Sequence, residues 1–142
     1  MGHDKTAQRP TSSADWHVGG DVAAQARSVP HVRHAIGAML QRYGAPRETL
    51  GKVELAVSEA AANVVLHAYD GRGVPGQLHY DADITDGGLE VVVTDDGGGL
   101  RDDHHSDGLG LGLKLIAAVS DDFAVTQRRF GLEVWMRFAL DA

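Results

Sequence analysis

The sequence predicts an α/β (α+β) two-layer sandwich, in which an antiparallel-rich sheet is covered on one face by about three helices. Three observations predict this fold class. Apolar residues recur at helical spacing in two long segments, they alternate with polar residues in several later segments, and glycine-rich turns separate these segments. Helices and strands that are apolar on one side bury that side against each other, which produces two layers.

Length and composition describe one globular domain. The chain has 142 residues, of which 43% are hydrophobic and 23% charged, and it has no cysteine for a disulfide or a thiolate zinc site. A net charge of −7 argues against nucleic acid as a partner, because binding a phosphate backbone needs clustered Lys and Arg. No stretch has the ~18 apolar residues of a membrane span, and no signal peptide is recognisable. We therefore expect a cytoplasmic protein without a membrane partner.

The folded domain is expected to begin near Trp16. Residues 1–15 are mostly polar, which predicts a flexible tail, and residues 16–142 are expected to form a single domain. A short strand is expected over residues 16–21.

Two helices are expected next. Pro30 suits the first turn of a helix that runs to about Tyr43 and stops at Gly44, and Pro46 opens a second helix that reaches Ala68. The second helix carries an apolar stripe at helical spacing: Leu50, Val53, Val57, Ala60, Val64 and Ala68.

Four strands and a third helix complete the predicted sandwich. Strands are indicated by apolar residues at every second position, and this period places Asp95 on the apolar side of its strand. Its carboxyl group is therefore expected to face the covered side of the sheet. The expected ranges are 78–85, 89–95, 123–129 and 132–140 for the strands, 113–120 for the helix and 70–76 for a loop.

Glu59, Asn63 and His67 are spaced four residues apart, so they are expected on one face of the second helix. Glu59 and Asn63 can reach one small volume, where the amide oxygen would ligate Mg²⁺ and the carboxylate would orient or deprotonate an attacking hydroxyl or water. Such a pair suits phosphoryl transfer. The alternative is structural: a solvated glutamate, with the Asn and His side chains satisfied by local hydrogen bonds.

The segment 95–99 reads Asp-Asp-Gly-Gly-Gly at the end of a valine-rich strand. The carboxylate of Asp95 can accept a hydrogen bond from an adenine amino group, while the glycines let the backbone pass close to the base. The alternative is a plain Asp-Gly turn.

The segment 108–113 reads Gly-Leu-Gly-Leu-Gly-Leu and precedes the third helix. Its glycines permit a loop that brings backbone N–H groups and the helix N-terminus to phosphates, and its leucines would anchor that loop in the core. The spacing fits neither a dinucleotide-binding fingerprint nor a P-loop. The run 102–107 is expected to be a solvated lid rather than a metal site, because consecutive residues rarely converge on one ion.

These three motifs, in this order, resemble the GHKL superfamily, which contains the ATP-binding domains of gyrase, Hsp90, histidine kinases and MutL on the Bergerat fold. The resemblance covers about residues 16–140. The single small domain, the Glu-Ala-x-x-Asn-x-x-x-His-Ala-Tyr pattern at 59–69 and the Gly-Leu-Gly-Leu segment resemble the anti-sigma factor serine kinases of bacteria. The resemblance implies a Bergerat-type mixed, mostly antiparallel sheet and a Mg-ATP-dependent serine kinase.

The resemblance also implies a role for each motif residue. Glu59 would be the catalytic base, Asn63 the magnesium ligand and Asp95 the carboxylate that reads adenine. The implied cofactors are ATP and Mg²⁺. The other residues implied at the nucleotide are His67, Gly97, Gly99, Gly108, Gly110, Leu111, Gly112 and Leu113.

Two protein partners follow from the resemblance. The family's substrate is a serine hydroxyl on a small anti-anti-sigma protein, the antagonist. The kinase also holds a sigma factor inactive, often as a kinase homodimer. Phosphorylating the antagonist releases it and leaves the kinase free to hold the sigma factor, which regulates transcription.

Two departures from the family pattern keep a second class of function open. The lid between Gly99 and Gly108 is short, and Arg101 is its one Lys or Arg, which predicts slow or absent transfer. Leu132 stands where many relatives have threonine, which predicts weaker adenine binding. The alternative to a kinase is a non-catalytic ATP-binding regulatory module. A histidine-kinase catalytic domain and a DNA-topology ATPase are expected to need a longer chain.

Overall fold

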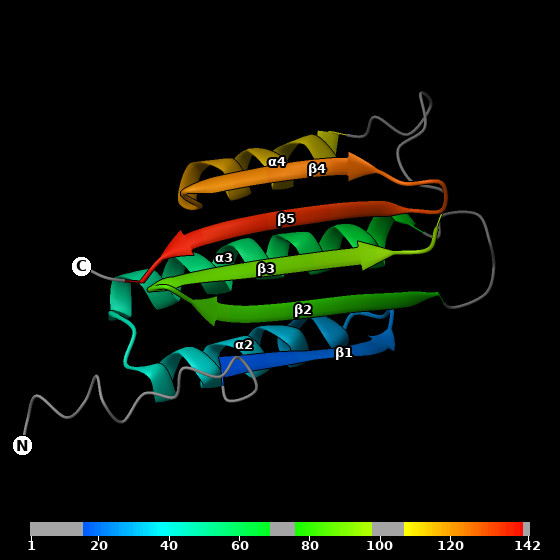
Figure 1. The fold of residues 1–142 in the computed structure, drawn as a ribbon. Coiled ribbons are helices and arrows are strands. Elements are labelled where there is room, and N and C mark those ends of the chain that lie inside the picture. The colour runs from blue at the N-terminus through cyan, green and yellow to red at the C-terminus, as the bar shows by residue number, and fades with distance from the viewer. Residues whose placement is uncertain (1–15, 69–75, 98–106, 141–142) are drawn as a thin grey trace, which may run out of the picture.

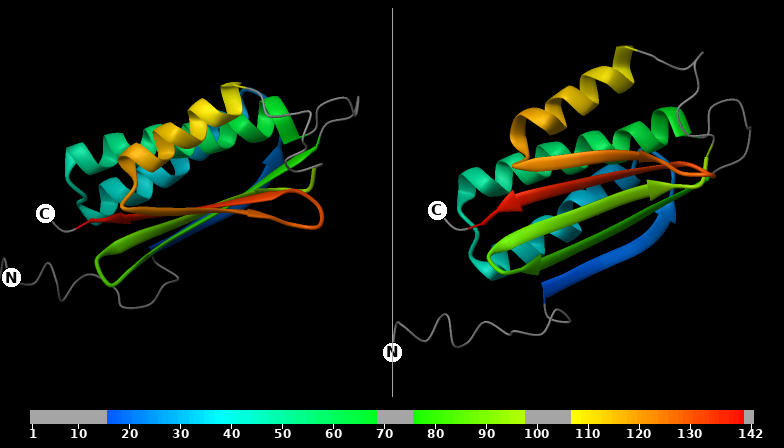
Figure 2. Two further views of the ribbon diagram at one scale, coloured as in Figure 1. Left: turned by 90° about the horizontal axis from the view of Figure 1, so that it is seen from above. Right: turned by 45° about the horizontal axis from the view of Figure 1, so that its top comes forward.

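The computed structural model describes residues 16–68, 76–97 and 107–140 (Figure 1). These residues form a five-stranded sheet and three α-helices. Seen from above, the helices lie on one side of the sheet and the other sheet face is open (Figure 2). The predicted two-layer α/β sandwich is confirmed. The expected tail over 1–15 and most of the expected loop over 70–76 lie outside the described residues.

The sheet has the strand order β1-β2-β3-β5-β4, and every described strand pairing is antiparallel. The expected mostly antiparallel sheet is thus antiparallel throughout its described strands. The two hairpins, β2–β3 and β4–β5, are joined at the centre of the sheet because β3 pairs with β5. The strands are β1 (His17–Ala23), β2 (Gln77–Thr85), β3 (Gly88–Asp95), β4 (Asp122–Gln127) and β5 (Leu132–Ala139).

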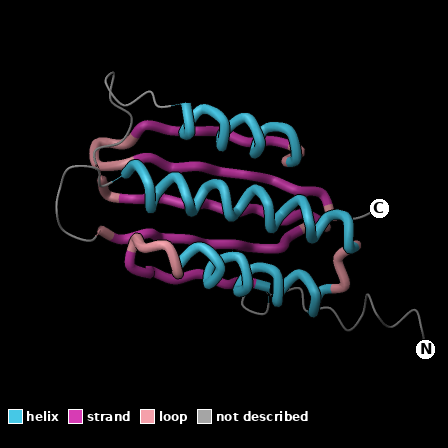
Figure 3. Tube along the Cα trace, turned by 180° about the vertical axis from the view of Figure 1, so that it is seen from behind, coloured by secondary structure: helices cyan, strands magenta, loops and turns pink. Residues whose placement is uncertain are grey.

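Three α-helices and one π-helical turn cover the sheet among the described residues (Figure 3). The central helix, α3, contacts β3 and β5, while α2 contacts β1 and α4 contacts β4. No described helix is both long enough and apolar enough to cross a membrane. The helical elements are α2 (Ser28–Tyr43), α3 (Arg47–Asn63), η2 (Val64–Ala68) and α4 (Asp107–Val119).

Gly44 ends its helix as predicted, and a tight turn joins β2 to β3. Gly44 ends α2 with a left-handed φ of 89°, and its N–H donates to the carbonyl groups of Leu40 and Gln41. Asp86 and Gly87 have φ values of 51° and 71°, which suit the tight turn between β2 and β3. These local signals set the boundaries of the neighbouring elements.

The core lies between the helices and the inner face of the sheet. Alternate residues of β2, β3 and β5 are buried, as their period-two pattern predicts. Asp95 shares the buried face of β3, which confirms its predicted orientation. The largest fully buried side chains include Phe138, Ile36, Met39, Leu40, Leu78, Leu89, Ile116 and Met136.

Two helical predictions need correction. The second helix was expected to remain α-helical to Ala68, but α3 ends at Asn63 and the next five residues form the π turn η2. The glycine-rich segment was expected to be a loop, but α4 begins at Asp107 and includes it. Leucine is a good helix former, and this propensity favours the helix.

Candidate functional site

Asp95 lies at the end of β3 on the covered face of the sheet, where only 4% of the residue is exposed. Its Oδ1 accepts the N–H of Gly97 at 2.8 Å, and the N–H of Leu132 is a second donor to the carboxyl group. Burial raises the pKa of the Asp95 carboxyl above its ordinary value, and the two N–H groups partly offset that effect. These donors hold a buried carboxyl group in one orientation.

Gly97 and Gly131 let two other chain segments touch this strand end. A Cβ atom on Gly131 would lie 1.8 Å from the carbonyl oxygen of Asp95, and a Cβ atom on Gly97 would lie 2.0 Å from that of Ala68. Gly131 also has a φ of 103°, which side chains other than glycine disfavour. The end of η2, the end of β3 and the β4–β5 turn therefore meet only because these positions lack a side chain.

Glu59 and Asn63 converge on Gly112 where α3 contacts α4. A Cβ atom on Gly112 would lie 3.1 Å from Asn63 Oδ1 and 3.2 Å from Glu59 Oε1. The amide nitrogen of Asn63 is buried and has no hydrogen-bond partner in the described part of the chain. A buried N–H donor without an acceptor costs free energy, so this group could serve a polar ligand that accepts a hydrogen bond. The carboxylate, the amide and a glycine backbone together form a small polar site.

The π turn changes how the helix motif presents His67. Residues from Val64 onward have more residues per turn than an α-helix, so the spacing that aligned His67 with Glu59 and Asn63 no longer applies. His67 is half-buried in this turn. Turns of this kind occur frequently at functional sites, and the predicted contact of His67 with nucleotide stays a prediction.

The two leucines of the glycine-rich segment whose side chains the structure describes, Leu111 and Leu113, lie in different environments. Leu113 packs against the hydrophobic core, as expected for an anchor. Leu111 is 60% exposed, so the expectation that it anchors the segment is wrong. Gly110 is exposed as well, on the helix rather than in a loop. The nucleotide contacts predicted for these residues and for Gly108 stay predictions.

Gly99 and most of the predicted lid, including Arg101, lie outside the described residues. Leu132 is buried opposite the end of β3. Its backbone N–H reaches the carboxyl group of Asp95. The main chain at this position therefore holds Asp95 regardless of the side chain.

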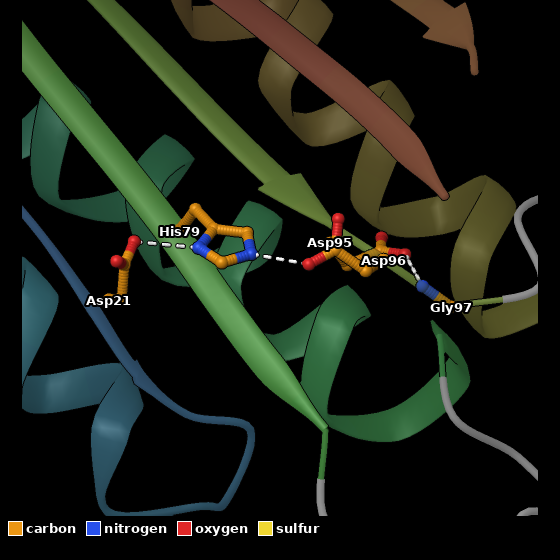
Figure 4. Close-up of polar contacts among 5 residues, drawn as sticks. All are labelled: Asp21, His79, Asp95, Asp96 and Gly97. Carbon is orange, nitrogen blue, oxygen red and sulfur yellow. Dashed lines mark hydrogen bonds and ion pairs between the residues drawn. The ribbon is translucent and has the colours of Figure 1, made fainter. Parts of the chain in front are cut away.

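A polar connection on the open face of the sheet was not foreseen from the sequence (Figure 4). His79 of β2 is hydrogen-bonded through Nδ1 to Asp21 Oδ1 at 2.6 Å and through Nε2 to Asp96 Oδ2 at 2.7 Å. These hydrogen bonds to Asp21 and Asp96 raise the pKa of His79 above its ordinary value. Alternation along β2 places His79 on the polar face, but only the strand order shows that β1 and β3 flank it.

Comparison with known sequences finds one matching family model and similar serine-protein kinases. Residues 22–138 match the family model of the histidine kinase-like ATPase domain. The serine-protein kinase RsbW of Staphylococcus epidermidis is 30% identical over 117 residues, which cover 72% of this chain and 74% of that protein. RsbW of Staphylococcus aureus strain bovine RF122 is 29% identical over 119 residues, which cover 73% and 75%.

Solved structures show the same arrangement of layers. The crystal structure of the RsbU and RsbW domains of Rv1364c from Mycobacterium tuberculosis superposes with a TM-score of 0.71 at 20% identity, over 87% of this chain and 32% of that one. The histidine kinase domain of the Erythrobacter litoralis EL346 blue-light activated histidine kinase gives 0.57 at 24% identity, over 79% and 61%. This chain spans less than two thirds of either structure, and at these identities the likeness concerns the fold.

Proposed function

The chain belongs to the histidine kinase-like ATPase domain family, and from this membership we propose that it is a Mg-ATP-dependent protein serine kinase that acts as an anti-sigma factor. Its similarity to serine-protein kinases over nearly three quarters of both chains supports the choice of acceptor. The observation that carries the proposal is the convergence of Glu59 and Asn63 on Gly112. Phosphoryl transfer needs a base and a metal ligand side by side at a phosphate-binding backbone.

The residues present fit the groups that such a kinase binds. Asn63 offers a buried amide whose nitrogen is unpaired among the described residues, and its oxygen is of the ligand type that Mg²⁺ prefers. Asp95 is a buried hydrogen-bond acceptor beside two glycines, Gly97 and Gly131. A side chain at either glycine would collide with the backbone at the end of the strand. An acceptor of this kind suits the exocyclic amino group of adenine. The site thus offers separate positions for the adenine ring and for the phosphates.

Each site residue has one task in the proposed reaction. Asn63 would hold Mg²⁺, which neutralises charge on the phosphates when it is bound. Glu59 would accept the proton of the attacking serine hydroxyl while the serine oxygen bonds to the γ-phosphorus and ADP leaves. Asp95 would orient the adenine ring, and the first turn of α4, which includes Gly108 and Gly110, would direct its free backbone N–H groups at the phosphates.

Two partner proteins complete the proposal. The acceptor is the serine hydroxyl of a small anti-anti-sigma protein, and the second partner is a sigma factor held by a homodimer of this chain. The similarity to RsbW over most of the domain supports both assignments. Phosphorylation of the antagonist would release it and leave this chain free to hold the sigma factor.

Calorimetry and a transfer assay test the function in sequence. ATP is titrated into the protein with and without Mg²⁺, and labelled phosphate transfer is then followed to an anti-anti-sigma protein and to its acceptor Ser→Ala variant. Magnesium-dependent binding and transfer that requires the serine are expected. Binding without transfer would instead identify a non-catalytic ATP-binding regulatory module, which the short lid favours. Absence of binding at millimolar nucleotide would refute both functions.

Replacing Asn63 with alanine is expected to remove the magnesium dependence of ATP binding. The reason is that the variant loses the one amide proposed to ligate the ion, while Asp95, the proposed contact to adenine, stays intact. Calorimetric titrations of ATP with Mg²⁺ and with EDTA measure the effect. A Glu59→Gln variant is the matched control and should keep the dependence. An Asn63→Ala protein that still binds ATP more tightly with Mg²⁺ would contradict the ligand role.

Replacing Asp95 with asparagine is expected to weaken ATP binding by about 10-fold to 100-fold, because the charged acceptor for the amino group of adenine is lost. Folding should not suffer at pH 7. The raised pKa of Asp95 means that its ionised form costs folding free energy above that pKa, and the cost disappears as the group is protonated on acidification. Asparagine carries no such cost, so the variant should be at least as stable as the original protein.

The difference in stability between the two proteins should shrink as the pH falls through the pKa of Asp95 toward its ordinary value of 3.8. Thermal unfolding at several pH values measures this difference, and calorimetry measures the affinity. A variant that is much less stable at pH 7, or one that binds ATP as tightly as the original, would contradict the assignment.

A further inference from the structure

His79 lies on β2, between β1 and β3, on the open face of the sheet (Figure 4). It is paired in register with Asp21 of β1 and with Thr94 of β3. Asp96 lies two residues beyond Thr94 on the same face. Both ring nitrogens lie at hydrogen-bond distance from carboxyl groups, 2.6 Å from Asp21 and 2.7 Å from Asp96. An ionised carboxylate only accepts hydrogen bonds, so the form of the ring that satisfies both ionised partners is the imidazolium, which donates from both nitrogens.

The contact with Asp96 bears directly on the candidate nucleotide site. Asp96 follows Asp95 in the chain, and successive residues at a strand end point to opposite faces. Asp95 projects into the covered layer and accepts the N–H of Gly97, while Asp96 projects to the open face and accepts from His79. Tethering the side chain of Asp96 therefore restricts the backbone that sets the direction of the Asp95 carboxyl group.

Charge adds to this restriction. The negative charge of Asp96 disfavours ionisation of Asp95, and the Nε2 atom of His79 lies 2.7 Å from Asp96 Oδ2. A protonated His79 offsets the repulsion between the two neighbouring carboxylates. A neutral His79 would contribute no such positive charge.

We infer that His79, in its protonated form, is a positioning residue for the Asp95 carboxyl group: it ties Asp96 to β2 and β1 and so holds Asp95 in the orientation that binds the nucleotide. This inference rests on the proposed function for the identity of the ligand. His79 does not touch Asp95 itself, because it lies on the opposite face of the sheet. Its effect on binding passes through Asp96.

The groups that face His79 define what its titration depends on. Asp21 and His17 lie on β1, Asp81 lies on β2 itself, and Asp96 lies at the end of β3. The open-face hollow of about 370 Å³ is lined by His79 together with Asp21, His17 and Asp81. Asp21 and Asp96 are the two that hydrogen-bond to His79, and they favour its charged form. His17 is instead paired with Asp81.

The test compares His79→Gln with His17→Gln in the full chain. The first variant loses the imidazolium that holds Asp96, and the second loses a histidine of the same face that contacts Asp81 instead. ATP affinity, measured by calorimetry at pH 6, is expected to fall about fivefold to tenfold in His79→Gln and to be unchanged in His17→Gln. Thermal unfolding of both variants checks that they are folded.

The pH profile separates positioning from a general structural role. The ratio of the ATP affinities of the original protein and His79→Gln should shrink as the pH rises through the pKa of His79, because the neutral ring no longer holds Asp96. This ratio cancels the ionisation of ATP itself. Asp21→Asn, which removes a carboxylate partner of His79 but does not touch Asp96, should move the change to lower pH. A ratio that is constant with pH would overturn the inference.

Hydrogen exchange gives a readout that needs no nucleotide. The N–H of Gly97 is held by Asp95 Oδ1, so its exchange, followed by NMR in the free protein, should be faster in His79→Gln than in His17→Gln. Equal Gly97 exchange in both variants would overturn the inference even if ATP does not bind. Absence of ATP binding to the original protein would by contrast refute the proposed function and leave the exchange result to decide the role of His79.

Discussion

Replacing Glu59 with glutamine is expected to slow phosphate transfer to the antagonist by roughly 10²-fold to 10⁴-fold, the usual contribution of a positioned general base. Glutamine keeps the size of the side chain beside Gly112 but accepts no proton from a serine hydroxyl. ATP affinity and its magnesium dependence should change little, because Asn63 and Asp95 are untouched. Single-turnover transfer at saturating ATP, combined with calorimetry, measures the two effects separately.

Glu48→Gln is the matched control for this substitution. It removes the same charge from the first turn of the same helix, where Glu48 is exposed and pairs with Lys52 at 3.8 Å. Transfer should proceed at the original rate in that variant. A Glu59→Gln protein that transfers phosphate as fast as the Glu48→Gln protein would exclude Glu59 as the base.

Replacing Gly131 with alanine is expected to destabilise the fold by about 2–4 kcal/mol. Part of that cost is the strain of an L-residue at a φ of 103°, and part is the collision of its Cβ with the carbonyl oxygen of Asp95, at 1.8 Å in the present backbone. Relief requires the β4–β5 turn and the end of β3 to separate. ATP affinity should fall as well, because this movement displaces Asp95.

Thermal and urea unfolding measure the loss of stability, which corresponds to a fall in midpoint of roughly 10 °C for a domain of this size. Gly51→Ala is the control. That glycine is exposed in α3 with nothing within 4 Å of an added Cβ, so alanine should raise stability by about 0.5–1 kcal/mol through helix propensity. If Gly131→Ala melts at the temperature of the original protein, the close contact with Asp95 is not present in solution.

Most of the fold could be predicted from local patterns, and the exceptions have physical causes. Alternation located the long strands, and Gly44 ended its helix as expected, because these signals depend on a few neighbouring residues. The glycine-rich segment was misread as a loop because helix propensity of its leucines and packing against α3 outweigh the cost of its glycines. The π turn after Asn63 has no comparable sequence signal.

The candidate site, too, has contacts that local patterns predict and contacts that they do not. Helical spacing was enough to bring Glu59 and Asn63 together, since one turn of helix separates them. The contact of both with Gly112, and of Asp95 with Gly131, joins segments distant in the chain and depends on how α4 and β5 pack. His79 was missed for the same reason, because its partners lie on two other strands.

By itself, the sequence determined the two-layer fold class, the family resemblance and the residue types of the site, because periodicity, turn chemistry and short motifs are local properties of the chain. Tertiary structure alone decided which of those residues meet. The strand order places β1 and β3 on either side of His79, and the packing of α4 on α3 brings Gly112 to Glu59 and Asn63. Such contacts depend on burying apolar faces across the whole domain, which no short stretch of sequence records.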